Sequence, residues 1–197
     1  PCRRFVNLVN QLLKKIMNLL PRPLLIQGSF IIRPVLVWFM KGDRFVDPID
    51  GQGYYSLLPY GYEKQRDNVL SPGTFSLERH RLMWLYLKNE TTFFSRKAKV
   101  LHIAPEQSFI KRFRAMPNLE YITSDLESPL ADVKADICDL PFGDDTFDLV
   151  FCNHVLEHIP DDHKAMSELF RVMKPGGWGI LQVPISYQRE VTYEDPT

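Results

Sequence analysis

Short apolar segments alternate with amphipathic segments between residues 98 and 184, and this alternation constrains the fold more than any other feature. Apolar runs of four to eight residues are typical of strands that are buried on both faces of a parallel sheet. The predicted strands cover residues 99–104, 119–123, 135–137, 147–152 and 178–183. Strands that alternate with helices predict an α/β fold, a Rossmann-like doubly wound and mostly parallel sheet.

The connecting segments have the features of crossover helices. Residues 161–173 carry apolar side chains at helical spacing, and two aspartates begin the segment, where the helix dipole favours acids. Lys174 and the Pro-Gly-Gly that follows are expected to end this helix. A second helix is predicted from Pro105, placed in its first turn, to about Met116. A third is predicted over residues 77–87.

Polar residues gather where the predicted strands end. Ligands of doubly wound sheets bind outside the carboxyl ends of the strands. Three such ends are Ala104-Pro105-Glu106, Asp125 and Cys152-Asn153-His154, and the turn at residues 136–139 joins them. A ligand site is therefore predicted at this edge of the sheet.

In this order and spacing, the segments resemble the class I S-adenosylmethionine-dependent methyltransferases of the kind called type 11. The resemblance covers about residues 98–184. It rests on Asp125, DxxDLPF at 136–142, FDLV at 147–150, VLEH at 155–158 and RVMKPGG at 171–177. The family carries a glycine-rich turn after its first strand, whereas residues 102–108 read HIAPEQS and contain no glycine. The first motif of this chain is thus a glycine-free variant.

The resemblance implies S-adenosyl-L-methionine as the cofactor. This cofactor has no phosphate, so a glycine nest for pyrophosphate is not required. Asp125 is expected to accept hydrogen bonds from the ribose hydroxyls, and Asp136 resembles the acid that accepts from the adenine amino group. Glu106 is expected to contact the amino group or a ribose hydroxyl of the cofactor. The predicted cofactor-binding residues are His102, Ala104, Pro105, Glu106, Asp125, Leu126, Asp136, Ile137 and Asn153.

Structural roles compete with these assignments. Asp125 and Asp136 are also good turn or cap residues, and His102 fits a hydrogen-bonded core histidine equally well. His154 is the candidate catalytic residue, as the base for an acceptor that must lose a proton. A role for His154 in opening a short helix carries similar weight.

Two other functions use the same residues. His154, Glu157 and His158 spell HxxEH, a zinc-hydrolase pattern, but the flanking FDLV and KPGG segments have no explanation under that hypothesis. A non-catalytic module that keeps the fold without useful cofactor affinity is the other alternative. We predict a methyltransferase that acts on an unidentified acceptor and holds no metal.

Composition excludes several classes of protein. The chain has 197 residues, 45% hydrophobic content and no net charge, and nothing in it points to nucleic-acid binding. Three scattered cysteines do not form a disulfide framework, which favours a reducing, cytoplasmic location.

Residues 1–42 form a basic extension with seven Lys or Arg and no acid. Apolar side chains of residues 3–20 fall on one face of a predicted amphipathic helix. Such a helix can lie on an anionic membrane surface, or it can cover the sheet or a substrate. The predicted acceptor is a small molecule or a lipid-like molecule. Breaks at Gly28 and Pro34 argue against a spanning helix in residues 24–40.

Residues 43–76 are rich in Tyr, Gly and Pro and are predicted to be irregular. Some methyltransferases that the chain resembles carry a CxxC…CxxC pair here, which implies a zinc ribbon. The corresponding positions are Asp47, Asp50, Ser71 and Thr74, so no structural zinc is predicted. Residues 77–197 then form the methyltransferase domain. It is expected to be incomplete at its C-terminus, because too few residues follow Pro184 for the last two strands of the seven-stranded family sheet.

Overall fold

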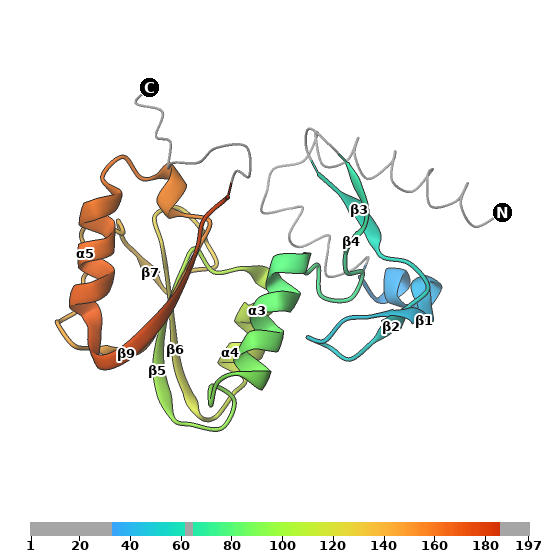
Figure 1. Ribbon diagram of the computed structural model, residues 1–197, viewed down its shortest axis with the longest axis horizontal. Helices are drawn as coiled ribbons and strands as arrows, with labels where there is room; N and C mark the ends of the chain where they lie inside the picture. The colour runs from blue at the N-terminus through green and yellow to red at the C-terminus, as the bar shows by residue number, and fades with distance from the viewer. Residues whose placement is uncertain (1–32, 62–64, 186–197) are drawn as a thin grey trace. The chain divides into compact units, whose positions relative to one another are not determined.

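The computed structural model describes residues 33–61 and 65–185 (Figure 1). The chain divides into two compact units, residues 1–84 and 85–197, and the division falls within α3 (Glu78–Asn89). The domain boundary near residue 77 stays a prediction. The predicted amphipathic helix over residues 3–20 lies outside the described residues. Among the described helices, none has the length and apolar character needed to cross a membrane.

The first unit contains two small antiparallel strand pairs after a helical segment at residues 33–40. Strand β1 (Lys41–Val46) pairs with β2 (Gly53–Tyr54), and β3 (Leu58–Tyr60) pairs with β4 (Arg66–Leu70). Its buried cluster consists of Met40, Tyr54, Leu57 and Leu58. Residues 43–76, predicted to be irregular, therefore have more regular structure than their composition indicates.

The second unit is built on a five-stranded sheet in which all neighbouring strands are parallel (Figure 1). The strands are β5 (Ala98–Ile103), β6 (Leu119–Asp125), β7 (Val133–Lys134), β8 (Phe147–Asn153) and β9 (Met173–Gln182). Their spatial order is β7-β6-β5-β8-β9, so the chain changes direction across the sheet between β5 and β8. This order confirms the predicted doubly wound, Rossmann-like sheet and places its topological switch point at the ends of β5 and β8.

The helices of this unit follow the predicted pattern with small shifts. They are α4 (Gln107–Arg114), the short 3-10 helix η1 (Leu156–His158) and α5 (Asp162–Val172). Asp161 caps α5, because its carboxylate accepts a hydrogen bond of 2.9 Å from the Lys164 amide. The placement of Pro105 in the first turn of α4 is wrong: the N-cap is Glu106, so Pro105 lies before the helix.

The third strand also differs from its prediction over residues 135–137, since β7 covers only Val133–Lys134. The Ala135 amide still donates to the Asp125 carbonyl at 3.2 Å, but the Asp136 carboxylate then accepts from the Cys138 amide at 2.8 Å. This side-chain bond turns the backbone, and pairing with β6 ends.

Alternate residues of the central strands pack on opposite faces of the sheet, as the pleat requires. Leu101 and Ile103 join the buried cluster that includes Ala165 and Leu169 of α5. His102 faces the other side, where its ring lies against Phe109 of α4 and Phe151 of β8. His102 is therefore surrounded by aromatic rings and is fully buried.

Candidate functional site

A cavity of about 120 Å³ lies at the carboxyl ends of β5 and β6. It is lined by Ile103, Ala104, Ser124, Asp125, Leu126, Ala135, Asp136, Ile137, Val155 and Ile159. Both predicted acids therefore line the same cavity, at the carboxyl edge of the sheet. Leu126, Ile137 and Ala104 of the predicted cofactor set line it too, whereas His102, Pro105, Glu106 and Asn153 do not.

Asp125 has a structural role that leaves one of its oxygens available. Its Oδ1 accepts hydrogen bonds from the amides of Glu127 at 2.8 Å and Ser128 at 2.7 Å, which shapes the loop after β6. Its Oδ2 accepts no hydrogen bond from any residue that the structure describes. The turn role expected as the alternative is thus present, and it is compatible with ligand binding through Oδ2.

Asp136 lies on the facing loop, with Oδ1 bonded to the Cys138 amide. Ile137 follows it and is 5% exposed, so the backbone beside the cavity is anchored in the core. Burial, and then the charge of Asp136, raise the pKa of the Cys138 thiol, which keeps this thiol neutral. The loop therefore presents one carboxylate and an apolar wall to the cavity.

A clamp from α5 holds this loop. Arg171 donates to both oxygens of Glu168 at 2.7 Å, to the carbonyls of Phe142 at 2.8 Å and Leu140 at 3.1 Å, and to Asp144 at 2.8 Å. Glu168 Oε2 in turn accepts from the Leu140 amide at 2.9 Å. Hydrogen bonds from Arg171 lower the pKa of Glu168 to about 2. The RVMKPGG segment contained this arginine, but its partners Leu140, Phe142 and Asp144 lie too far away in sequence to be predicted.

The ends of the two central strands share an unusual backbone. Ala104 after β5 has a φ of 48° and His154 after β8 has a φ of 55°, in the left-handed region that glycine adopts most easily. Each is held by a bond to the next strand: the Ala104 amide donates to Ser124 at 2.9 Å, and the His154 amide to Gln182 at 2.7 Å. Ala104 thus adopts the turn that a glycine would normally make beside the cavity.

Glu106, His102 and Asn153 form a network behind this turn. The Nε2 of His102 lies 2.6 Å from Oε2 of Glu106, at ion-pair distance but without the alignment of a hydrogen bond. The Nδ1 of His102 is 2.7 Å from the Tyr121 hydroxyl, and Asn153 donates to Oε1 of Glu106 at 3.1 Å. Burial, and then the charge of Glu106, raise the pKa of Tyr121, so this hydroxyl stays protonated. The geometry of His102 is that of a hydrogen-bonded core histidine.

His154 is half-buried at the end of β8, and its Nδ1 lies 3.2 Å from Oε1 of Glu157. The HxxEH residues lie in a turn and a 3-10 helix, not on one face of an α-helix, so the two histidines lack the geometry of the zinc-hydrolase pattern. In residues 33–61 and 65–185, no group of three metal-ligating side chains comes together. The role of His154 as a base stays a prediction.

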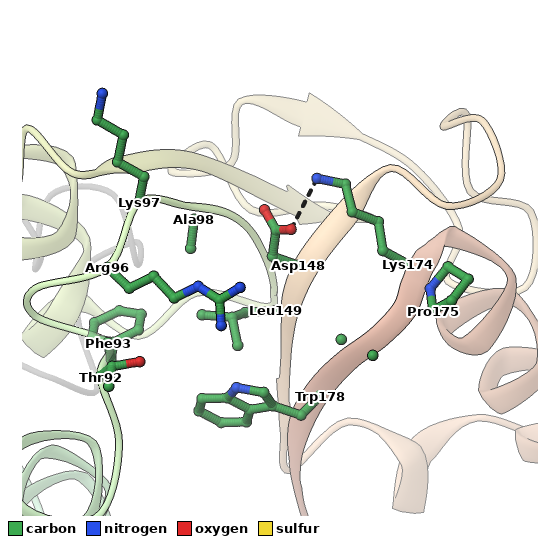
Figure 2. A pocket seen from close by; sticks show the side chains of 12 residues that line it. Thr92, Phe93, Arg96, Lys97, Ala98, Asp148, Leu149, Lys174, Pro175 and Trp178 are labelled. Carbon is green, nitrogen blue, oxygen red and sulfur yellow. Dashed lines mark hydrogen bonds and ion pairs between the residues drawn. The ribbon is translucent and has the colours of Figure 1, made fainter.

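A second cavity of about 120 Å³ lies at the opposite edge of the sheet, at the amino ends of β5 and β8 (Figure 2). Its walls include Phe93, Arg96 and Trp178, and the Lys174 ammonium pairs with Asp148 at 2.9 Å. Burial raises the pKa of Asp148, but the hydrogen bonds from the Lys99 amide and from Lys174 outweigh burial and hold this pKa below its ordinary value. Ligands of parallel sheets bind at the other edge, where the cavity lined by Asp125 and Asp136 lies.

Comparison with known proteins found similarity to methyltransferases. Residues 90–181 match a family model described as a methyltransferase domain. This segment is similar to a methyltransferase domain. A demethylmenaquinone methyltransferase of Clavibacter sepedonicus is 49% identical over 45 residues, which are 23% of this chain and 18% of that protein. A sterol 4-C-methyltransferase of Caenorhabditis elegans is 33% identical over 88 residues, which are 45% of this chain and 25% of that protein.

The aligned part of this chain thus spans a quarter or less of these two relatives. Among solved structures, a putative methyltransferase of Bacillus halodurans aligns with a TM-score of 0.38 and 27% identity. The alignment covers 44% of this chain and 40% of that one.

Proposed function

We propose that this chain binds S-adenosyl-L-methionine and transfers its methyl group to a small, lipid-like acceptor. The observation that carries the proposal is the pair Asp125 and Asp136, which come from separate loops and line one cavity at the carboxyl edge of the sheet. The alternation of strands and helices around this cavity, together with the family match over residues 90–181, supports the same function.

The residues of the cavity fit the parts of this cofactor. Asp125 would accept from the ribose hydroxyls through Oδ2, because its Oδ1 is already used by its own loop. Asp136 and the Ile137 backbone would bind the adenine edge, and Leu126, Val155 and Ile159 would pack on its apolar faces. Glu106, held by Asn153 and His102, would supply a negative charge near the methionine amino group.

The bound cofactor supplies an electrophilic methyl carbon, and the protein supplies position and electrostatics. His154 is our candidate for the residue that takes a proton from the acceptor. Glu157 lies at its Nδ1, which would leave Nε2 for the acceptor. We place the enzyme in the cytoplasm. Residues 3–20 would bring it to a membrane surface, in keeping with the quinone and sterol named for two kinds of relative.

A non-catalytic module that does not bind the cofactor usefully is the second candidate, favoured by Ala104 in place of a glycine and by the engagement of Glu106 with its neighbours. Calorimetry with S-adenosylmethionine and S-adenosylhomocysteine distinguishes the two. If the protein is the enzyme, we expect it to bind both compounds with micromolar affinity, and Asp125→Ala should abolish this binding. Asp139→Ala should not change it, since Asp139 is exposed and lies outside the cavity. A folded protein that binds neither compound would favour the module.

The acceptor needs a separate experiment. Incubation of the protein with methyl-labelled cofactor and a lipid extract should label a small, lipid-like acceptor, and His154→Ala should lower the rate without changing cofactor affinity. A label found only in water-soluble metabolites would contradict the lipid-like acceptor while leaving the cofactor assignment intact.

A further inference from the structure

Two turns of the first unit have the same backbone geometry. Residues 47–51 read Asp-Pro-Ile-Asp-Gly, and residues 71–75 read Ser-Pro-Gly-Thr-Phe. In each turn the amide of the fifth residue donates to the carbonyl of the first, at 2.8 Å from Gly51 and 2.9 Å from Phe75. Both fifth residues have positive φ, 71° for Gly51 and 54° for Phe75. Because this conformation is costly for phenylalanine, the surroundings must hold the second turn in place.

Asp47 connects the two turns. Its side chain is 1% exposed, and its Oδ1 accepts a 2.9 Å bond from the Ile49 amide in its own turn. Its Oδ2 accepts from two hydroxyls of the other segment, Thr74 at 2.5 Å and Ser76 at 3.1 Å. Thr74 and Ser76 are themselves buried. The carboxylate of Asp47 therefore joins segments that are about 27 residues apart in sequence.

The buried charge of Asp47 has a nearby counter-charge. Arg81 donates to the Ser76 carbonyl at 2.8 Å and lies 3.4 Å from the Ser76 hydroxyl that bonds to Asp47. Burial lowers the pKa of Arg81, and the charge of Asp47 opposes this effect. A buried carboxylate is tolerated when it is hydrogen-bonded and a counter-charge lies nearby.

The remaining contacts show how closely the turns approach. A Cβ atom at Gly73 would lie 2.1 Å from the Tyr54 hydroxyl and 2.5 Å from Oδ2 of Asp50, so the second turn closes on the first only with glycine there. Asp50 uses its other oxygen to accept from the Gln52 amide at 2.9 Å. Tyr54 is fully buried beneath the turns.

The first and fourth residues of the two turns are the positions at which the resemblance implies zinc ligands: Asp47, Asp50, Ser71 and Thr74. These residues do not fit zinc. None is a thiolate or imidazole, hydroxyls are poor ligands, and the oxygens of Asp47 already accept three hydrogen bonds. We infer that Asp47 is the centre of a metal-free clasp, in which its carboxylate, the hydroxyls of Thr74 and Ser76, and the charge of Arg81 hold together two turns that a metal would otherwise join.

Amide hydrogen exchange of the whole protein tests the clasp locally. In Asp47→Ala, peptides covering residues 47–55 and 69–76 should exchange at least about tenfold faster than in the unaltered protein, the factor expected for losing one hydrogen bond to a charged group. Asp67→Ala is the matched control, because Asp67 is an exposed acid of the same unit. If Asp47→Ala does not fold, Thr74→Val removes one hydroxyl with little change of shape. Equal exchange in the Asp47 and Asp67 variants would overturn the inference.

Metal dependence gives two further outcomes. Neither a chelator nor added zinc should change the amide exchange of the unaltered protein. The metal-free clasp would be contradicted if the protein held about one tightly bound zinc per chain and its removal loosened the two turns. The fourfold variant D47C/D50C/S71C/T74C should bind one Co²⁺ with the absorption of a tetrahedral thiolate site. A folded fourfold variant that binds no metal would show that the turns do not face each other as described. Neither outcome depends on methyl transfer.

Discussion

The imidazole of His102, within strand β5, and the carboxylate of Glu106, in the turn that follows this strand, lie 2.6 Å apart, and the resembling family has a glycine-rich turn at this place. His102 is fully buried and also contacts the Tyr121 hydroxyl, while Glu106 reaches Asn153 on the next strand. The glycine-free turn is thus supported by a polar network that connects β5, β6 and β8.

Removing His102 should destabilise the methyltransferase domain. In His102→Leu, the Tyr121 hydroxyl and the Glu106 carboxylate lose a partner in a buried site, which costs about 2–4 kcal/mol of unfolding free energy. Urea denaturation measures this change. His163→Leu, at an exposed position of α5, is the control and should stay within about 0.5 kcal/mol. A loss below about 0.5 kcal/mol in His102→Leu would contradict the proposed network.

The two oxygens of Asp125 can be tested separately. Asp125→Asn keeps a carbonyl oxygen for the amides of Glu127 and Ser128 but loses the second carboxylate acceptor. We expect unchanged thermal stability and an affinity for S-adenosylmethionine at least about tenfold lower, because a hydrogen bond to a charged group is lost. Calorimetry and a melting curve on the same sample measure both quantities. A fall in stability with unchanged affinity would instead assign Asp125 a turn role alone.

Substitution of Ala104 by glycine and by valine should change the stability of the protein in opposite directions. Ala104→Gly relieves a left-handed backbone at φ 48° and should raise unfolding free energy by about 1 kcal/mol. Ala104→Val places a β-branched side chain in the same conformation and beside the cavity, so it should lower both stability and cofactor affinity. Denaturation and binding experiments on the two variants test this order. A valine variant more stable than the glycine variant would show that the turn does not adopt this conformation.

The clamp between Glu168 and Arg171 should make stability depend on pH. The pKa of Glu168 is lowered from its ordinary 4.5 to about 2 in the folded protein, so its contribution is complete above about pH 4.5. As pH falls toward 2, the carboxylate is protonated and the contribution is lost. The difference in unfolding free energy between the unaltered protein and Glu168→Gln should therefore be larger at pH 7 than at pH 3. An equal difference at both values would contradict the lowered pKa.

Several elements of the second unit were predictable because their signals are local. The run FDLVFC and the helical spacing of α5 each lie within one segment, and their alternation was sufficient for the doubly wound sheet. The N-terminus of α4 was predicted less well, because Pro105 is compatible with a first helical turn and Glu106 gives no side-chain cap that would mark the true start. The short third strand was displaced by a side-chain bond of Asp136.

The candidate site combines local and distant information. Asp125 and Asp136 were identified from motifs, and the parallel sheet brings their loops to one cavity. Which oxygen of Asp125 remains available depends on backbone amides two and three residues away, and this geometry is visible only in the folded chain.

The order of strands and helices, the two acids and the absence of cysteine at positions 47, 50, 71 and 74 were determined by the sequence alone, since each is a property of neighbouring residues or of residue type. The partners of Glu106, Arg171 and Asp47 were decided only by the tertiary structure. Glu106 meets Asn153 across 47 positions, Arg171 meets Leu140 across 31, and Asp47 meets Thr74 across 27. Such pairs form because packing the apolar segments encloses these polar groups together, and a buried polar group must then bond to whichever neighbour the fold supplies.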